Sequence, residues 1–137
     1  MTGEWKKGDV LPAISLPLTL RRSVQAVAGT RDYYPVHHDE KFARDSGAQG
    51  IFFNTMFLQG FAGRAISEWF GNDAFPRRLE IAMRGSNYVG QTLTIEGTVE
   101  SVRESEGRRL VDAEATMRTE DGPTTGVKMT VQLGPGK

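Results

Sequence analysis

The strongest helical pattern in the chain runs from Asn54 to Gly71, and any fold of this sequence has to cover it. Its apolar side chains recur as adjacent pairs about every four residues, which gives a helix one wide apolar face. These side chains are Phe57, Leu58, Phe61, Ala62, Ala65, Ile66, Trp69 and Phe70. Asparagine commonly caps the start of a helix, and glycine commonly ends one. We therefore predict a helix over residues 54–70 that is largely buried.

Four runs of alternating apolar and polar residues follow Pro76. A period of two is typical of a strand with one buried face. Turn sequences separate the runs at Val89-Gly90, Glu106-Gly107 and Asp121-Gly122-Pro123. The apolar members of the runs are Leu79, Ile81 and Met83; Leu93, Ile95, Gly97 and Val99; Val111, Ala113, Ala115 and Met117; and Val127, Met129, Val131 and Leu133. We predict an antiparallel meander of four strands whose apolar face packs on the long helix.

The N-terminal part of the chain predicts one further strand and a short helix. Leu16, Leu18 and Leu20 alternate with other residues, and Pro17 restricts such a strand to an edge or a strand start. From Leu20 the apolar spacing becomes helical, and we expect this helix to stop at Gly29.

Asp39 is expected to cap a second short helix that ends near Gly47. Together these elements predict an α+β fold in which an antiparallel sheet of about five strands wraps around one central helix. The sequence contains no interdomain linker, so we predict a single domain over residues 1–137.

Composition excludes several functional classes. The 137 residues include 17 basic and 17 acidic side chains, and this zero net charge argues against a nucleic-acid partner. Cysteine is absent, which excludes disulfides, thiolate metal sites and cysteine nucleophiles. No apolar stretch approaches the roughly 20 residues that cross a bilayer, and the first residues contain no apolar signal core. We expect a soluble cytoplasmic protein that does not bind a membrane.

The two histidines are adjacent, and they lie in a loop that also contains Asp32 and Pro35. Histidine titrates near neutral pH, so Asp32 and His37 are candidates for an acid–base pair that holds a water molecule. The alternative is a solvated surface loop. His37, His38 and Asp39 do not suit a metal ion, because adjacent side chains of an extended loop point apart, and we predict no metal. The chain lacks phosphate-binding and dinucleotide-binding glycine motifs, and we predict no separate cofactor.

Two further features are candidates for binding a ligand. Asn54 is expected to cap the long helix with its side chain, while the free N–H groups and the dipole there favour negative charge, such as an enolate-like thioester oxygen. Arg77 and Arg78 could contact a phosphorylated ligand. The alternative for these two arginines is a solvated surface of mixed charge.

The loop sequence resembles that of a known family. Asp32-Tyr33-Tyr34-Pro35-Val36-His37 is similar to the D-x-N-P-[LIV]-H motif of MaoC-like, (R)-specific enoyl-CoA hydratases. Gly50-Ile51-Phe52-Phe53-Asn54 lies where that family carries a P-I-A-H-G segment. Tyr34 replaces the asparagine of the motif, and Asn54 replaces the glycine. The resemblance extends over most of the chain and implies the hot-dog fold.

The resemblance also implies a reaction and a set of residues that perform it. Asp32 and His37 would activate a water molecule that adds to a trans-2-enoyl-CoA, and the backbone N–H of Asn54 would polarise the thioester carbonyl. Coenzyme A is then part of the substrate. The residues expected to bind the substrate are Tyr34, Phe53, Arg77 and Arg78.

In its details the loop looks most like the small hydratase subunits of actinobacterial steroid side-chain degradation. Such chains pair with a second MaoC-like chain, so we expect a homodimer or a heteromer that acts on acyl-CoA substrates in steroid or fatty-acid β-oxidation. Two alternatives remain open at this stage. The chain could be an acyl-CoA thioesterase of the same fold, or a non-catalytic subunit that binds the acyl group.

Overall fold

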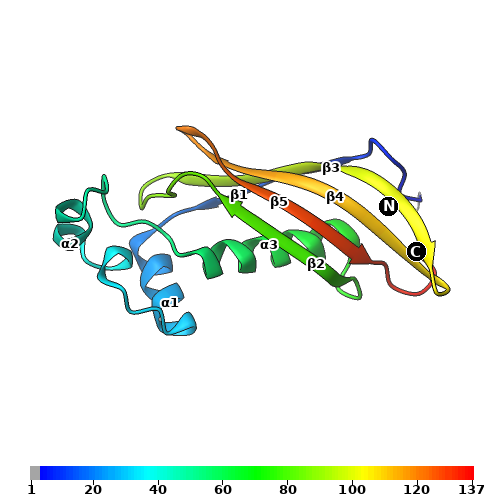
Figure 1. The fold of residues 1–137 in the computed structure, drawn as a ribbon, viewed down its shortest axis with the longest axis horizontal. Helices are drawn as coiled ribbons and strands as arrows, with labels where there is room; N and C mark the ends of the chain where they lie inside the picture. The colour runs from blue at the N-terminus through cyan, green and yellow to red at the C-terminus, as the bar shows by residue number, and fades with distance from the viewer. Residues whose placement is uncertain (1–3) are drawn as a thin grey trace.

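The computed structural model describes residues 4–137, and its centre is one long helix beneath a five-stranded antiparallel sheet (Figure 1). The elements in chain order are β1 (Val10–Pro17), α1 (Leu20–Thr30), a 3₁₀ turn η1 (Pro35–His37), α2 (Glu40–Asp45), α3 (Thr55–Phe70), β2 (Phe75–Met83), β3 (Thr92–Ser105), β4 (Arg108–Thr119) and β5 (Gly122–Gln132). The sheet lies along one side of α3, and α1 and α2 lie beyond the end at which α3 begins.

The helix α3 forms where the apolar pattern predicts it. The side chain of Asn54 accepts a hydrogen bond from the Phe57 N–H at 2.8 Å, and Gly71 ends the helix with a φ of 97°. The buried side chains of the helix are Leu58, Phe61, Ala62, Ala65, Ile66, Trp69 and Phe70. Met56 is 42% exposed, because the sheet covers only one side of α3. The helix is therefore buried along one face rather than largely buried all round.

The predicted meander is correct for three strands and wrong for β2. The sheet order is β1-β3-β4-β5-β2, so β2 pairs with β5 at one edge and is not paired with β3. The connection from β2 to β3 pairs instead with the residues before α3, through the Phe53 N–H to the Asn87 carbonyl at 2.9 Å. Alternation in a sequence defines the buried face of each strand but not its neighbour, which explains the error.

The first strand and helix differ from the prediction at their boundaries. β1 begins at Val10 rather than near Leu16, and its two prolines, Pro12 and Pro17, are tolerated because β1 is the other edge of the sheet. The α1 helix continues one residue past Gly29 to Thr30, and Arg31 then adopts the left-handed conformation with a φ of 58°. The predicted cap at Asp39 is confirmed, since its side chain accepts a hydrogen bond from the Phe42 N–H at 3.0 Å.

Apolar side chains from α3 and from the inner face of the sheet form one core. At Gly97 of β3 the backbone lies so close to β4 that no side chain fits: a Cβ at this position would lie 2.8 Å from the Ala115 Cα. In the part of the chain that is described, no helix is long and apolar enough to span a membrane.

Candidate active site

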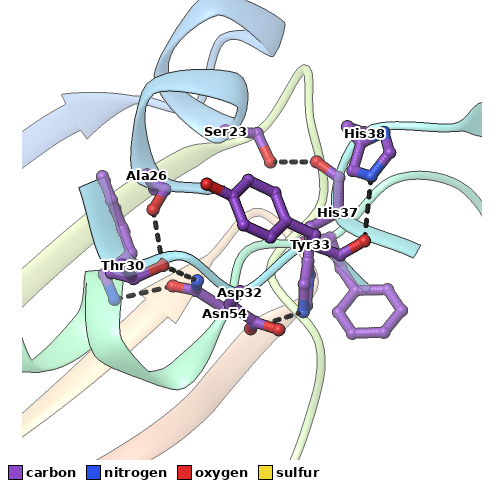
Figure 2. A network of polar contacts seen from close by, with 10 residues as sticks. Ser23, Ala26, Thr30, Asp32, Tyr33, His37, His38 and Asn54 are labelled. Atoms are coloured by element: carbon purple, nitrogen blue, oxygen red, sulfur yellow. Dashed lines mark hydrogen bonds and ion pairs between the residues drawn. The ribbon is translucent and has the colours of Figure 1, made fainter. Parts of the chain in front are cut away.

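Asp32 and His37 face each other at the end of the molecule where α3 begins (Figure 2). The 3₁₀ turn that starts at Pro35 folds the chain back, with the His38 N–H donating to the Pro35 carbonyl at 3.0 Å. This turn brings the His37 Nε2 to 3.3 Å from the Asp32 Oδ2. The His37 side chain is 8% exposed, whereas that of Asp32 is 27% exposed. The solvated-loop interpretation is therefore wrong for His37 and correct for His38, which is exposed.

The ring of His37 has a defined tautomer when it is neutral. Its Nδ1 lies 2.6 Å from the Phe52 carbonyl oxygen, which can only accept a hydrogen bond, so Nδ1 carries a proton. The lone pair of the neutral ring then lies on Nε2, which faces Asp32. The main chain of His37 is held as well, because the Ser23 hydroxyl donates to the His37 carbonyl at 2.6 Å.

The contact between these two groups requires a proton. An ionised carboxylate and an unprotonated Nε2 both accept hydrogen bonds, so they repel each other unless a hydrogen lies between or beside them. A proton on either group, or a water molecule that donates a hydrogen bond to both groups, removes this repulsion. Each arrangement is that of an acid–base pair, and the exposed side of Asp32 leaves room for water. The geometry suits proton transfer to and from a small bound molecule.

The start of α3 lies beside this pair. Asn54 is almost fully buried, and its side-chain oxygen caps the helix while its Nδ2 donates to the Thr30 hydroxyl at 3.0 Å. Within residues 4–137, no group accepts a hydrogen bond from the backbone N–H of Asn54. A free donor at the positive end of a helix dipole suits an oxygen that gains negative charge.

The aromatic residues predicted to bind substrate have different surroundings. The Tyr34 ring is 55% exposed and lies edge-on to the His37 ring, with centroids 6.3 Å apart. The Phe53 ring is fully buried and packs on Phe57 at 4.6 Å, so within this chain it offers no surface to a ligand. Its neighbour Phe52 lies closer to the acid–base pair, with its ring centroid 5.1 Å from that of His37.

Arg77 and Arg78 are not brought to this pair within the chain. They lie near the start of β2, beside the C-terminal end of α3, whereas His37 lies at the opposite end of that helix (Figure 1). Arg77 donates to the Gln132 side chain at 2.9 Å, and Arg78 donates to Glu80 at 2.8 Å. Both arginines are exposed, and their contact with a ligand stays a prediction.

A cleft in this chain lies elsewhere. It has a volume of about 1020 Å³ and crosses the outer face of the sheet, where Val10, Glu80, Glu114 and Lys128 are among its lining residues. Neither Asp32 nor His37 lines it. Among residues 4–137, no group of three or more side chains is arranged to hold a metal ion.

Three residues of the site were missed by the sequence analysis. Ser23 and Phe52 bind His37 through hydrogen bonds to a partner 14 and 15 residues away, and Thr30 binds Asn54, which is 24 residues away. Serine and threonine inside a helix, and the backbone carbonyl of an aromatic residue, carry no pattern that identifies such partners. Only the folded chain shows these contacts.

Comparison with known proteins gives consistent results. A family model described as the MaoC like domain matches residues 7–122. The 3-oxo-4,17-pregnadiene-20-carboxyl-CoA hydratase beta subunit of Mycobacterium tuberculosis (strain ATCC 25618 / H37Rv) is 30% identical over 97 residues, which are 71% of this chain and 75% of that protein.

Two solved structures have the same fold. A chain in the crystal structure of the ChsH1-ChsH2 complex from Mycobacterium tuberculosis superposes with a TM-score of 0.86 and 25% identity, covering 93% of this chain and 97% of that one. The (R)-hydratase from A. caviae involved in PHA biosynthesis superposes with a TM-score of 0.84 and 19% identity, covering 94% of this chain and 97% of that one.

Proposed function

Because the chain belongs to the MaoC-like dehydratase family, we propose that it is a hydro-lyase that hydrates a trans-2-enoyl-CoA thioester to the 3-hydroxyacyl-CoA. Its fold is the hot-dog fold of such hydratases. The observation that carries the proposal is the Asp32–His37 contact of 3.3 Å, with the Nδ1 of His37 already committed to the Phe52 carbonyl.

In the proposed reaction, Asp32 and His37 hold one water molecule. As its oxygen bonds to the β-carbon, one of its protons passes to the pair, and the α-carbon receives a proton from the same site. The net change is the addition of H₂O across the double bond. The free N–H of Asn54 would stabilise the negative charge that develops on the thioester oxygen. Position and charge together account for such catalysis without a cofactor.

We propose that a second MaoC-like chain completes the site. His37 is buried, and the cleft of about 1020 Å³ on the sheet does not reach it, so an acyl group needs a wall from elsewhere. The similarity to a protein named a beta subunit, and to a chain from a two-component complex, supports a heteromer over a homodimer. Arg77 and Arg78, remote from His37 in their own chain, would then contact the coenzyme A phosphates at a site formed with the partner.

The name of the M. tuberculosis relative also supports a substrate class. That protein is named for a steroid enoyl-CoA with a short side chain. We therefore propose a steroid side-chain enoyl-CoA as substrate rather than a linear fatty enoyl-CoA, and Tyr34 as part of the surface that such a substrate contacts.

The test measures hydration and thiol release together. Crotonyl-CoA and a steroid enoyl-CoA are incubated with the purified chain, alone and after mixing with a second MaoC-like chain, and the loss of the conjugated double bond is followed. A thiol reagent in parallel detects free coenzyme A. We expect hydration without thiol release.

The other outcomes point to other functions. Thiol release would establish a thioesterase instead. Activity of the mixture that survives Asp32→Ala and His37→Ala would make this chain the non-catalytic subunit.

A further inference from the structure

Thr30 connects the end of α1 to the cap of α3 (Figure 2). Its hydroxyl donates to the Ala26 carbonyl at 2.6 Å and accepts from the Asn54 Nδ2 at 3.0 Å. The Asn54 oxygen meanwhile accepts from the Phe57 N–H at 2.8 Å. Each donor thus has one acceptor, and this network fixes the orientation of both the hydroxyl and the amide.

The Thr30–Asn54 hydrogen bond lies two residues before Asp32 and so fixes the position of the backbone that carries the Asp32 side chain. Only Arg31 separates Thr30 from Asp32, and Arg31 is a non-glycine residue in the left-handed conformation, with a φ of 58°. Such a conformation persists only where the surrounding structure holds it. The Thr30 contact is the tie nearest to that turn, so it holds the point from which the Asp32 carboxyl extends toward His37.

The same link also locates the proposed oxyanion donor. Asn54 presents its backbone N–H at the start of α3, and its side chain is bound on one side to α3 and on the other to α1. Without the Thr30 hydroxyl, the Nδ2 of the almost fully buried Asn54 loses its acceptor. A buried donor without an acceptor costs free energy, so the Asn54 side-chain amide would rotate toward another acceptor. Asp32 and the Asn54 N–H would then shift relative to each other.

We infer that Thr30 is a positioning residue that sets Asp32 at its distance from His37 and from the Asn54 N–H. The inference rests on the proposed hydratase function and adds a residue that does not touch the reacting atoms. It acts on the chemical step rather than on substrate binding, because it holds two groups that meet in the transition state.

The test compares Thr30→Val with Thr30→Ser. Valine has the shape of threonine without the hydroxyl, and serine keeps the hydroxyl. We expect kcat for enoyl-CoA hydration to fall about 10-fold in the valine variant, with KM changed by less than about two-fold, and the serine variant to restore most of the rate. Thr19→Ala is the matched control, because it removes the cap that accepts from the Arg22 N–H at the other end of α1.

A double-mutant cycle identifies the partner. Asn54→Ser keeps a capping oxygen and the backbone N–H but is too short to reach Thr30, so we expect it to lower kcat as well. If the two residues act as one link, the double variant loses no more than the more affected single variant. Additive losses, a serine variant as slow as the valine variant, or an equal kcat loss in Thr19→Ala would each overturn the inference.

A readout without substrate separates this inference from the proposed function. The ring-nitrogen NMR shifts of His37 report its contact with Asp32, and we expect them to move in Thr30→Val but not in Thr30→Ser or Thr19→Ala. If the wild-type protein hydrates no enoyl-CoA but these shifts move as described, the hydratase proposal fails and the positioning role stands. Unchanged shifts in Thr30→Val contradict the positioning role whatever the activity.

Discussion

The two neighbouring histidines have opposite surroundings, although they are chemically identical. His37 is buried, with its Nδ1 bound to the Phe52 carbonyl and its Nε2 facing Asp32. His38 is exposed, and its Nε2 lies 3.2 Å from the Tyr33 carbonyl. The 3₁₀ turn directs the two rings apart, so only one of them can work with the carboxyl. This makes His38 a close internal control for any role assigned to His37.

Replacing each histidine with glutamine tests that assignment. We expect His37→Gln to lower kcat/KM for enoyl-CoA hydration by at least about 100-fold, because an amide cannot exchange a proton near neutral pH. His38→Gln should stay within about two-fold of the wild-type protein. The assay follows the loss of the enoyl thioester in the presence of the partner chain. Equal effects of the two substitutions would remove His37 from the reaction.

The carboxylate of Asp112 in β4 is bound by three side chains of the sheet. It accepts hydrogen bonds from Arg103 Nε at 2.8 Å, from the Thr130 hydroxyl at 2.7 Å and from the Ser101 hydroxyl at 2.8 Å. The hydrogen bond from Arg103 is the main reason why its pKa falls from 3.8 to about 2. A carboxyl whose pKa is lower in the folded state than in the unfolded state stabilises the folded protein above its unfolded pKa.

This stabilisation should disappear as the pH falls from about 4 to about 2. We expect Asp112→Asn to lower the free energy of unfolding by about 1 to 2 kcal/mol at pH 6, after allowance for the partial exposure of the side chain. The difference from the wild-type protein should shrink toward zero near pH 2. Urea unfolding followed by circular dichroism at several pH values measures it. A difference that is constant with pH would show that the carboxylate charge is not the cause.

At the scale of the elements, α3 has one face in the core and one face that the sheet does not cover. Leu58 is fully buried, whereas Met56, two residues earlier, is 42% exposed. The helix is thus held by packing along one stripe, while its start carries the Asn54 cap. Core packing and site geometry therefore depend on the same helix but on different residues of it.

Truncation of Leu58 and of Met56 compares what the buried face and the exposed face of α3 contribute to the free energy of unfolding. We expect Leu58→Ala to lower the free energy of unfolding by about 2 to 5 kcal/mol, because it removes packed methyl groups and leaves a cavity. Met56→Ala should lower it by less than about 1 kcal/mol. Denaturant unfolding of the isolated chain compares the two. Similar losses would mean that the exposed face of α3 is also packed.

At the scale of the whole molecule, the sheet that packs on α3 contains one position where two strands leave no room for a side chain. Gly97 lies where β3 meets β4, and an added Cβ would lie 2.8 Å from the Ala115 Cα, which is backbone and cannot rotate away. Gly126 of β5 has no atom within 4 Å of the equivalent position. The sheet therefore has room for a larger side chain at position 126 but not at position 97.

Alanine at each position tests this difference. We expect Gly97→Ala to lower the free energy of unfolding by about 1 to 3 kcal/mol, because the strands must move apart. Gly126→Ala should be neutral or slightly stabilising, since alanine fits there and restricts the unfolded chain. Thermal unfolding of both variants beside the wild-type protein decides the matter. Tolerance of Gly97→Ala would show that the two strands can separate locally without cost.

The sequence determined which segments fold and, for α3, β3, β4 and β5, which of their faces are buried. The predicted buried face of β2 is wrong at Met83, which is 40% exposed at the edge of the sheet, and Leu79 and Ile81 are only partly buried. The paired apolar residues specified α3, the alternating runs specified the strands, and Asn54, Asp39 and Gly71 specified helix ends, because periodicity and capping depend on neighbours along the chain. The acid, proline and histidine spacing singled out the pair of residues that the fold brings together at 3.3 Å.

Only the tertiary structure decided how the segments meet. Only the folded chain shows that β2 lies beside β5 and that Phe53 is buried. The hydrogen bonds of Ser23 to His37 and of Thr30 to Asn54 likewise join residues that are far apart in the sequence. Such contacts depend on how all the elements pack together, and this cannot be read from the residues next to each other in the sequence. The same holds for the two arginines of β2, whose separation from His37 became visible only in the folded molecule.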